Sequence, residues 1–494
     1  MDVLNMFSDL TPYTLLLGLV MVLLIAVIMS QQEQPGIPPG PSAWPVVGNV
    51  FDMGGKYKGK RHKYFDDMRK KYGSIYRFYF GNQLYVVLND ADSIEEAFVK
   101  HKSEFSNRPV DAFWIVRESN KSGTGIIWSN DDEWKVKREL ALQILGESNL
   151  EDMVRAETKV VLDVLSQSDG KPLASQGLFL NATVNIISRI LLGSRFDDND
   201  PDFLRIIDVV STSFTNEGTF SMLNVFPKLR FLPFIASKLR VLFDKVGKVR
   251  NYLSGQISEH KKQYTKDKLN DLIDVYLSKN GHDDGMKLVS EGDLVKLILE
   301  LFPAASVTTM ISLNWALLYM ILHPEIQKKC QDEIGSVVGT NRMVHWSDRS
   351  KLPYTQATLL EIQRVASVTA TSIPHTPTKD VVLSGFLIPK DCVVLANLYS
   401  CHFDEQIWDE PLVFKPERFL NDARNPTKPP AFMPFSTGPR RCPGESLVVL
   451  ELFVFFTNIL QKFSLTGSGE LSTDGNYAIF LSPPPFLIHA KGRQ

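Results

Sequence analysis

Residues 435–444 read Phe-Ser-Thr-Gly-Pro-Arg-Arg-Cys-Pro-Gly, and an apolar segment with the character of a helix, 446–460, follows directly. A single cysteine, Cys442, stands between two glycines, Gly438 and Gly444, and next to two arginines. Five specified residues at this fixed spacing are expected by chance in roughly one chain in ten thousand. This stretch therefore decides how the remaining sequence is interpreted.

The residue types of the stretch suit a cysteine thiolate that binds haem iron. A thiolate is a strong axial ligand, and backbone donors and a helix N-terminus stabilise its charge. Glycines at 438 and 444 allow the backbone to approach a flat macrocycle, Arg440 is placed to reach a haem propionate, and Phe435 to shield the sulfur. The alternative is a structural cysteine at the start of a buried helix, and the specific spacing favours the haem ligand.

The composition is that of a globular protein. The 494 residues are 44% apolar and 22% charged, with a formal net charge of −2, which excludes disorder, collagen and coiled coil as descriptions of the whole chain. The four cysteines are too few for a disulfide framework, and no two have the C-x-x-C spacing of a structural zinc site. This cysteine usage fits a reducing, cytosol-facing location.

The N-terminal part divides into three segments. Residues 10–30 carry no charge and are long enough to cross a hydrocarbon core of about 30 Å, so we expect a retained membrane anchor. Basic residues follow this segment and none precedes it, which places residues 1–9 on the lumenal side and the rest in the cytosol. Residues 31–48 are rich in proline and are expected to form a stiff hinge before one large domain, 49–494.

The periodicity of the remaining chain predicts a mainly helical fold with small β-sheets. We expect a strand pair over 74–89, mostly helices over 90–280, loops near 106–130 and 215–235, and a polar connector over 279–286. Short strands return near 380–397 and 477–490. A second uncharged run, 301–322, contains proline, serine, threonine and asparagine, so we interpret 290–322 as one core helix rather than a span.

The 435–444 segment resembles the haem-binding loop of the cytochrome P450 family, and the likeness extends over essentially the whole chain. Glu361 and Arg364 are similar to the family's E-x-x-R pair, and Arg418 in Pro-Glu-Arg-Phe to the arginine that completes this network. By the same resemblance, further residues are implied to contact haem propionates: Arg108, Trp134, Arg138 and His375. The closest likeness is to animal microsomal members that handle drugs, steroids and other lipids.

The resemblance implies a haem b group with Cys442 as axial ligand, and an anchor in the endoplasmic reticulum membrane. It also implies electrons from NADPH through NADPH–cytochrome P450 reductase, with cytochrome b5 as a further candidate donor. By position, an apolar substrate pocket is implied around Phe113, Phe214, Phe220, Ala304, Ala305, Ser372 and Ile479. Lys135, Lys137 and Arg441 are candidates for a basic face toward the electron donor, although exposed lysines are usually only solvated.

The central helix departs from the family pattern, in which an acid precedes the oxygen-activating threonine. Here Thr308 is present, but Val307 stands at the acid's position and Pro303 replaces a glycine. Valine cannot relay a proton, which leaves Ser306 or an ordered water chain as the substitute.

Three functions stay open at this point. The first is a monooxygenase that inserts one oxygen atom into a steroid, fatty acid, terpenoid or xenobiotic. The second is a haem-thiolate isomerase or dehydratase that acts on a peroxide or epoxide without a reductase. The third is a lipid-binding haem protein without turnover. The retention of Thr308 favours the first, and consumption of NADPH, of peroxide substrate or of neither would separate them.

Overall fold

The computed structural model describes residues 13, 14, 16–18, 20–22 and 35–493, apart from 147–148, 216–221, 266–268 and 281–288. Most of the expected anchor, 10–30, and of the expected connector, 279–286, lies outside these residues. In the described part, helices dominate and small sheets accompany them, as the sequence predicts. The helices of more than eight residues are α2 (Arg61–Tyr72), α6 (Asp131–Leu145), α7 (Leu150–Ser168), α8 (Ser175–Leu192), α9 (Pro201–Thr215), α11 (Pro233–Gln263), α12 (Leu272–Asn280), α13 (Glu291–Leu322), α14 (Pro324–Val337), α15 (Pro353–Ala366) and α17 (Glu445–Lys462).

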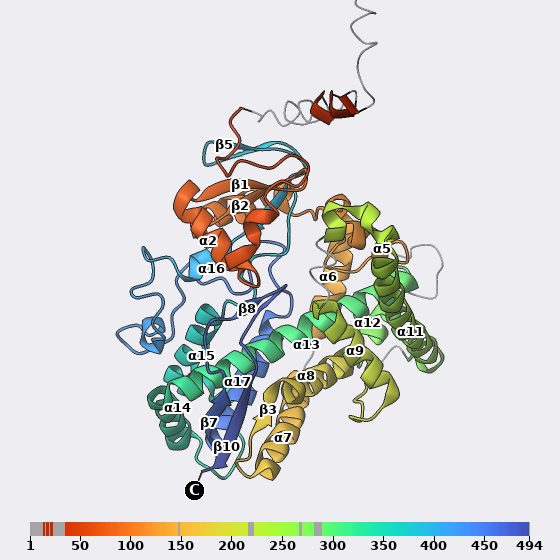
Figure 1. Cartoon of the computed structure of the whole chain (residues 1–494). Helices are drawn as coiled ribbons and strands as arrows, with labels where there is room; N and C mark the ends of the chain where they lie inside the picture. Colours follow the sequence, from red (N-terminus) through yellow and green to blue (C-terminus); the bar gives the residue numbers. More distant parts are fainter. Residues whose placement is uncertain are drawn as a thin grey trace, which may run out of the picture.

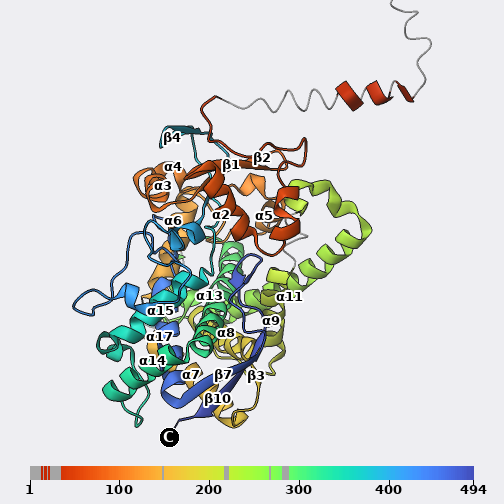
Figure 2. The same ribbon diagram turned by 60° about the vertical axis from the view of Figure 1, so that its left-hand side comes forward.

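The described residues form four small sheets, of which the one with β1 and β2 and the one with β7 and β10 lie at opposite ends of the molecule (Figures 1 and 2). One has the order β1-β2-β6, in which β1 (Ile75–Phe80) pairs antiparallel with β2 (Gln83–Leu88) and β2 pairs parallel with β6 (Val393–Ala396). A second has the order β3-β10-β7, and two hairpins complete the set. The remaining strands are β3 (Leu173–Ala174), β4 (Val381–Leu383), β5 (Phe386–Ile388), β7 (Phe463–Gly469), β8 (Asn476–Tyr477), β9 (Leu481–Ser482) and β10 (Phe486–Gly492). β1, β2, β4 to β6 and β8 to β10 fall in or at the edges of the predicted segments, whereas β3 and β7 were not predicted.

Helix α13 runs through the middle of the molecule in both views (Figures 1 and 2). Ser290 and Asp293 form a reciprocal capping box at its start, and the helix continues across Pro303. It packs on α8 and on α17, and it is the one helix among the described residues that is long and apolar enough to cross a membrane. Because 56% of its most apolar window is buried inside the protein, the structure agrees with the predicted core helix.

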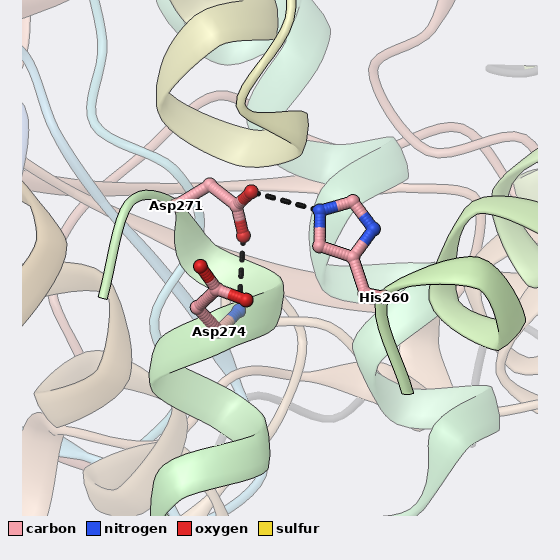
Figure 3. A group of neighbouring side chains, drawn as sticks. All are labelled: His260, Asp271 and Asp274. Atoms are coloured by element: carbon pink, nitrogen blue, oxygen red, sulfur yellow. Dashed lines mark hydrogen bonds and ion pairs between the residues drawn. The ribbon is translucent and has the colours of Figure 1, made fainter. Parts of the chain in front are cut away.

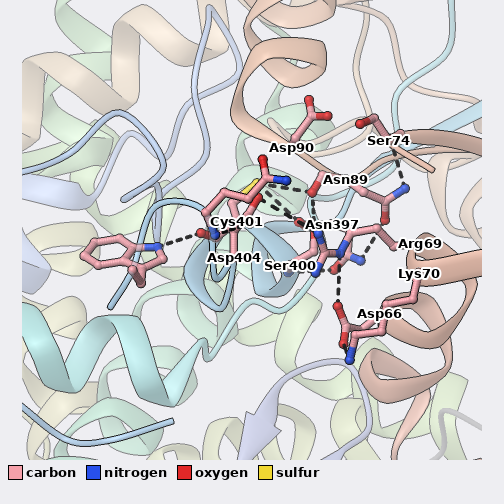
Figure 4. A network of polar contacts seen from close by, with 12 residues as sticks. Asp66, Arg69, Lys70, Ser74, Asn89, Asp90, Asn397, Ser400, Cys401 and Asp404 are labelled. Atoms are coloured by element: carbon pink, nitrogen blue, oxygen red, sulfur yellow. Dashed lines mark hydrogen bonds and ion pairs between the residues drawn. The ribbon is translucent and has the colours of Figure 1, made fainter. Parts of the chain in front are cut away.

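A buried polar network joins the first sheet to the short helix α16 (Leu398–His402) (Figure 4). Asn397 follows β6, and its Nδ2 donates to Asn89 Oδ1 beyond the end of β2 over 2.9 Å. The Asn397 side chain also accepts from the backbone N–H of Ser400 and so caps α16. The first bond links the ends of β2 and β6, and the second satisfies a backbone donor at the start of α16, so Asn397 holds α16 next to the sheet.

One loop differs from the prediction. Helix α5 (Trp114–Asn120) lies inside the segment 106–130, which was expected to be a loop. Its buried residues, Trp114 and Val116, pack with Leu223 of the 222–226 segment and with α11. This apolar contact is between segments far apart in sequence, and local periodicity cannot predict it.

Candidate haem-thiolate site

Cys442 lies in a turn immediately before α17. Its backbone N–H donates to the Phe435 carbonyl over 3.0 Å, which closes the loop, and the Phe435 ring packs against the main core. The sulfur is half-buried. Burial raises the pKa of the thiol, while a hydrogen bond from the backbone of Gly444 and the charges of Arg138 and Arg441 oppose this rise. The turn therefore presents a sulfur whose anionic form has a backbone donor and a helix N-terminus close by.

The two glycines of the loop occupy different kinds of position. Gly438 has a φ of +73°, and a Cβ atom there would lie 2.1 Å from the Phe98 carbonyl oxygen. Gly444 has ordinary dihedral angles, and a Cβ would lie 3.9 Å from the sulfur of Cys442. The loop can keep this shape only with glycine at 438, whereas glycine at 444 keeps the space beside the sulfur open.

Two arginines stack on the indole of Trp134 in helix α6. The Arg440 guanidinium carbon lies 4.0 Å from the ring centroid, and that of Arg138 lies 5.7 Å from it. Arg440 also donates to the carbonyls of Ser106 and Ser129, both over 2.7 Å. The aromatic face and the carbonyls hold two cations side by side.

Arg108 and His375 extend this cluster from another direction. Arg108 Nη1 donates to the carbonyls of Ile373 and Pro374, both over 2.9 Å. His375 is buried, its Nδ1 donates to the Phe105 carbonyl over 2.7 Å, and its ring lies on Phe98 at 3.9 Å between centroids. Burial, with the neighbouring Arg108 and Arg440, holds the pKa of His375 well below its usual value.

The cluster carries positive charge without a compensating carboxylate. Among the described residues, none of Arg108, Arg138 and Arg440 has an Asp or Glu oxygen within 4 Å. Burial lowers the pKa of Arg108 to about 9 and that of Arg440 to about 8. Buried charges are normally paired, so this donor set fits an anionic ligand such as the two propionates of haem. The residues present therefore fit the group that the sequence predicts.

Helix α13 carries Thr308, the predicted oxygen-activating threonine. Ala304 is exposed although it lies in the middle of this core helix, as expected where the helix borders an internal hollow. The Thr308 hydroxyl donates to the Ala304 carbonyl over 2.7 Å. Ser306 and Val307 are buried on other faces, and Ser306 donates to the Phe302 carbonyl over 2.6 Å. Ser306 as a substitute for the missing acid is thus not supported, because its hydroxyl is bound within its own helix on a different face from Thr308.

The expected pocket residues are placed unevenly. Phe113 is half-buried with its ring 5.3 Å from that of Trp128, and Ile479 is exposed. Ser372 must be removed from the lining, because it is buried and its hydroxyl accepts from the backbone N–H of Ala396; the adjacent Ile373 is 39% exposed instead. The side chains of Phe214 and Phe220 lie outside the described residues.

The E-x-x-R residues meet the arginine of Pro-Glu-Arg-Phe in a buried network. Arg364 Nε donates to Glu361 Oε2 over 2.7 Å, and Arg418 Nε donates to Glu361 Oε1 over 3.1 Å. His402, which sequence reasoning did not select, continues the network: Arg364 donates to its carbonyl, and its Nε2 accepts from the backbone N–H of Met433. The network thereby reaches the segment that leads into the cysteine loop.

Glu300 is a second residue that sequence reasoning missed. It lies on α13, one turn before Ala304, and its buried carboxylate accepts from the backbone N–H of Ile127 over 2.7 Å. Carbonyls of the same loop, 126–129, accept from Arg440. Glu300 thus holds the loop that positions a cation of the site, and its four-residue spacing from Ala304 is the signal that could have found it.

The proposed basic face needs correction. Lys137 is fully buried, and its ammonium group contacts Glu133 at 2.5 Å and Asp293 at 3.6 Å, so it cannot contact a partner. Trp134, Lys137, Ala141 and Ile144 share one buried helix face, a spacing that already indicates burial. Lys135 is exposed and paired with Asp132, and Arg441 is exposed and paired with Glu445.

A separate cluster of His260, Asp271 and Asp274 lies between α11 and α12 (Figure 3). His260 Nε2 is 2.9 Å from Asp271 Oδ2, and the other Asp271 oxygen accepts from the backbone N–H of Asp274. The hydrogen bond that protonated His260 donates to Asp271 raises the pKa of His260 to about 9. These contacts form an ion pair and a helix cap, which accounts for the cluster without a metal.

Comparisons with known proteins agree with this geometry. A family model described as Cytochrome P450 matches residues 38–490. The chain is 34% identical over 473 residues to Cytochrome P450 2D3 from Rattus norvegicus, with 92% of each chain covered. It is also 34% identical to Cytochrome P450 2U1 from Mus musculus, covering 97% of this chain and 95% of the relative, and to Cytochrome P450 2J2 from Homo sapiens, covering 96% and 94%.

Proposed function

The chain belongs to the cytochrome P450 family and is a haem monooxygenase of hydrophobic substrates, and we propose that Cys442 is the axial ligand of its haem. The observation that carries this assignment is the position of Cys442 before α17, beside a cluster of buried cations without carboxylate partners. In this arrangement Arg108, Arg138, Arg440, His375 and Trp134 would hold the propionates. When bound, the haem supplies the activation of dioxygen.

The chain's own residues then handle protons and exclude water. The Thr308 hydroxyl gives its hydrogen to the Ala304 carbonyl, so its oxygen remains an acceptor that can orient a water molecule. Val307 lies in the core and takes no part. Protons are therefore delivered by ordered water that the Thr308 oxygen orients, since Ser306 is buried on another face of the helix.

The substrate is a small hydrophobic molecule, of the class of steroids, fatty acids, terpenoids or xenobiotics. The groups that support this class are Ala304, Ala305, Phe113 and Ile479, which are apolar and accessible to varying degrees. Such a lining binds through buried apolar area and offers few polar groups to fix a charged ligand.

Electrons come from NADPH–cytochrome P450 reductase, with cytochrome b5 as a second donor. The cations that support a docking face are Lys428, Arg349 and Arg441; the charges of both arginines lower the pKa of Lys428, after the larger effect of its burial, so the three groups lie near one another. This group replaces the face that included Lys137. Basic side chains around the thiolate loop complement an acidic donor and speed its encounter.

The protein is anchored in the endoplasmic reticulum membrane by residues 10–30, with its catalytic domain in the cytosol. Large exposed apolar side chains near the hinge support this orientation: Trp44 is 62% exposed, Phe51 70%, Phe231 72% and Phe234 62%. The segment with Trp44 and Phe51 and the segment that leads to Phe231 and Phe234 come together at Gly81. A Cβ atom at Gly81 would lie 2.8 Å from Val225 and 3.7 Å from the Val46 carbonyl. Exposed aromatic side chains in one region fit a membrane interface.

The experiment is NADPH consumption by the purified holoprotein with added reductase. A monooxygenase oxidises NADPH and forms an oxygenated product from a lipid or steroid panel. Consumption of a lipid peroxide or epoxide without NADPH would favour the isomerase or dehydratase instead, and binding without consumption of either would favour a lipid-binding haem protein.

A further inference from the structure

Glu451 is a buried carboxyl group to which the proposed reaction assigns no role. It lies on α17, the helix that begins three residues after Cys442, and it is 2% exposed. Its Oε2 lies 3.1 Å from the hydroxyl oxygen of Thr309 on α13. Thr309 directly follows Thr308, so Glu451 connects the helix of the cysteine loop to the turn that carries the proton-handling threonine.

Counting hydrogens indicates the protonation state of Glu451. The Thr309 hydroxyl has one hydrogen and lies near two acceptors, the Ala305 carbonyl at 2.9 Å and Glu451 Oε2 at 3.1 Å. Both hydrogen bonds can exist together only if Glu451 donates a proton of its own to the Thr309 oxygen. Ionised Glu451 would take the Thr309 hydrogen and leave the Ala305 carbonyl without it.

The surroundings of Glu451 favour the neutral carboxyl group. Burial raises the pKa of Glu451 to about 8, and the hydrogen bond to Thr309 opposes this rise. The elements packed on α17 are α7, α13, α14, α15, β7 and the 3-10 helix Trp346–Lys351. No charged side chain among their described residues contributes to the shift. A carboxylate at this place would be a buried charge without a cation.

The α13 segment around Thr308 depends on side-chain contacts for its position. Pro303 lacks a backbone N–H and so removes one bond of the helix ladder. The Thr183 hydroxyl of α8 lies 3.2 Å from the Ser306 carbonyl oxygen, although the Phe179 carbonyl of its own helix is nearer at 2.8 Å, and Glu451 contacts Thr309 from α17. The two helices therefore fix the segment from different directions.

We propose that protonated Glu451 is a positioning residue that holds the Thr308 turn of α13 through Thr309, and that loss of its proton releases this contact. The contact and the protonation of Glu451 do not depend on the proposed monooxygenase function. Only the expected consequence, the retention of activated oxygen, rests on it. A displaced Thr308 would orient water less well, and more of the NADPH electrons would leave as hydrogen peroxide.

The first test measures the protonation of the Glu451 carboxyl group in the absence of turnover. Infrared difference spectra of the full-length ferric holoprotein are expected to show a protonated carboxyl band that is absent from Glu451→Gln and disappears with a midpoint near pH 8. Absence of that band in the wild type at about pH 6 would overturn the proposal, because Glu451 would already be ionised.

The pH dependence of stability is a second measure of the protonation of Glu451. The folded protein keeps the proton and the unfolded chain releases it, so the wild type loses stability as the pH rises from about 5 toward 8. Relative to Glu451→Gln, its unfolding equilibrium constant rises about tenfold per pH unit over this range. Equal slopes for the two proteins would contradict the assignment. Thr457→Val removes a buried hydroxyl of α17 that donates to its own backbone, and it is the matched control that keeps the slope.

The third test separates positioning from proton donation. With reductase and NADPH, the wild type is expected to release a larger share of electrons as hydrogen peroxide at about pH 9 than at about pH 6.5. Glu451→Gln, which still donates to Thr309, keeps the low share at both pH values, whereas Glu451→Leu and Thr309→Val show the high share at both. If Glu451→Gln behaves like Glu451→Leu, the proton itself is consumed and the positioning role is wrong.

Failure of the proposed function is a distinct result. A wild type that oxidises no NADPH at any pH would refute the monooxygenase assignment, while the infrared and unfolding measurements would still decide the protonation of Glu451.

Discussion

Neutralising Glu361 is predicted to destabilise the protein strongly while leaving its shape nearly unchanged. Glu361 accepts from Arg364 over 2.7 and 2.8 Å, from Arg418 over 3.1 Å and from the Lys415 backbone N–H over 2.9 Å. Glu361 and Arg364 are fully buried. Glu361→Gln keeps the volume and one acceptor oxygen but leaves two guanidinium groups without an anion.

The expected loss follows from this arrangement. Removing one partner of a buried ion pair costs about 3–5 kcal/mol, since the remaining charge stays out of water. Domains are stable by only about 5–15 kcal/mol, so a large part of the stability would be lost. Denaturant unfolding of the holoprotein, followed by tryptophan fluorescence, measures the change in the free energy of unfolding. Asp332→Asn, in the exposed pair with Lys328, is the control and should cost less than about 0.5 kcal/mol. A loss below about 1 kcal/mol for Glu361→Gln would refute the reasoning.

Three further changes have defined outcomes. His260→Gln should lower the melting temperature at about pH 7 but not above about pH 10. The bond to Asp271 raises the pKa of His260 from 6.5 in the unfolded chain to about 9 in the folded protein. The stabilisation is therefore complete below the unfolded pKa and is lost as the pH rises through the folded pKa. Gly438→Ala should abolish haem incorporation, measured as the haem-to-protein ratio, because its Cβ would clash with the Phe98 carbonyl. Ser306→Ala should leave the share of NADPH electrons released as peroxide unchanged, because Ser306 is fully buried on a different face of α13 from Thr308.

Each of these changes has a matched comparison. An equal loss of melting temperature at both pH values would show that His260 acts through packing alone. Gly444→Ala, with its nearest atom at 3.9 Å, should incorporate more haem than Gly438→Ala, and equal incorporation would contradict the steric argument. Thr308→Ala should raise the peroxide share, and a comparable rise for Ser306→Ala would place that serine in the proton path.

The sequence alone predicted the parts of the fold that depend on local pattern. The core helix 290–322, the strand pair before residue 90 and the cysteine loop before an apolar helix all rest on periodicity or fixed spacing, and the structure contains each of them. The helix that carries Glu451 was also expected, but its contact with Thr309 depends on how two distant helices pack. A pattern along one helix carries no information about the partner that its buried face meets.

The two corrections to individual residues have the same origin. Lys137 was interpreted as exposed because lysines usually are, yet its position on the buried face of α6 places it against two carboxylates. Ser372 was assigned to the pocket by position, but its hydroxyl satisfies a backbone N–H of β6. In both cases a tertiary hydrogen bond or ion pair outweighs the general preference of the residue type.

The measurement that tests the central assignment most directly is the carbon monoxide difference spectrum of the reduced protein, wild type against Cys442→Ala. The wild type is expected to show the Soret band of thiolate-ligated haem. The variant lacks the sulfur but keeps the cation cluster, and it is expected to lose that band. The same thiolate band in Cys442→Ala, or its absence from the haem-loaded wild type, would contradict the assignment of Cys442 as the axial ligand.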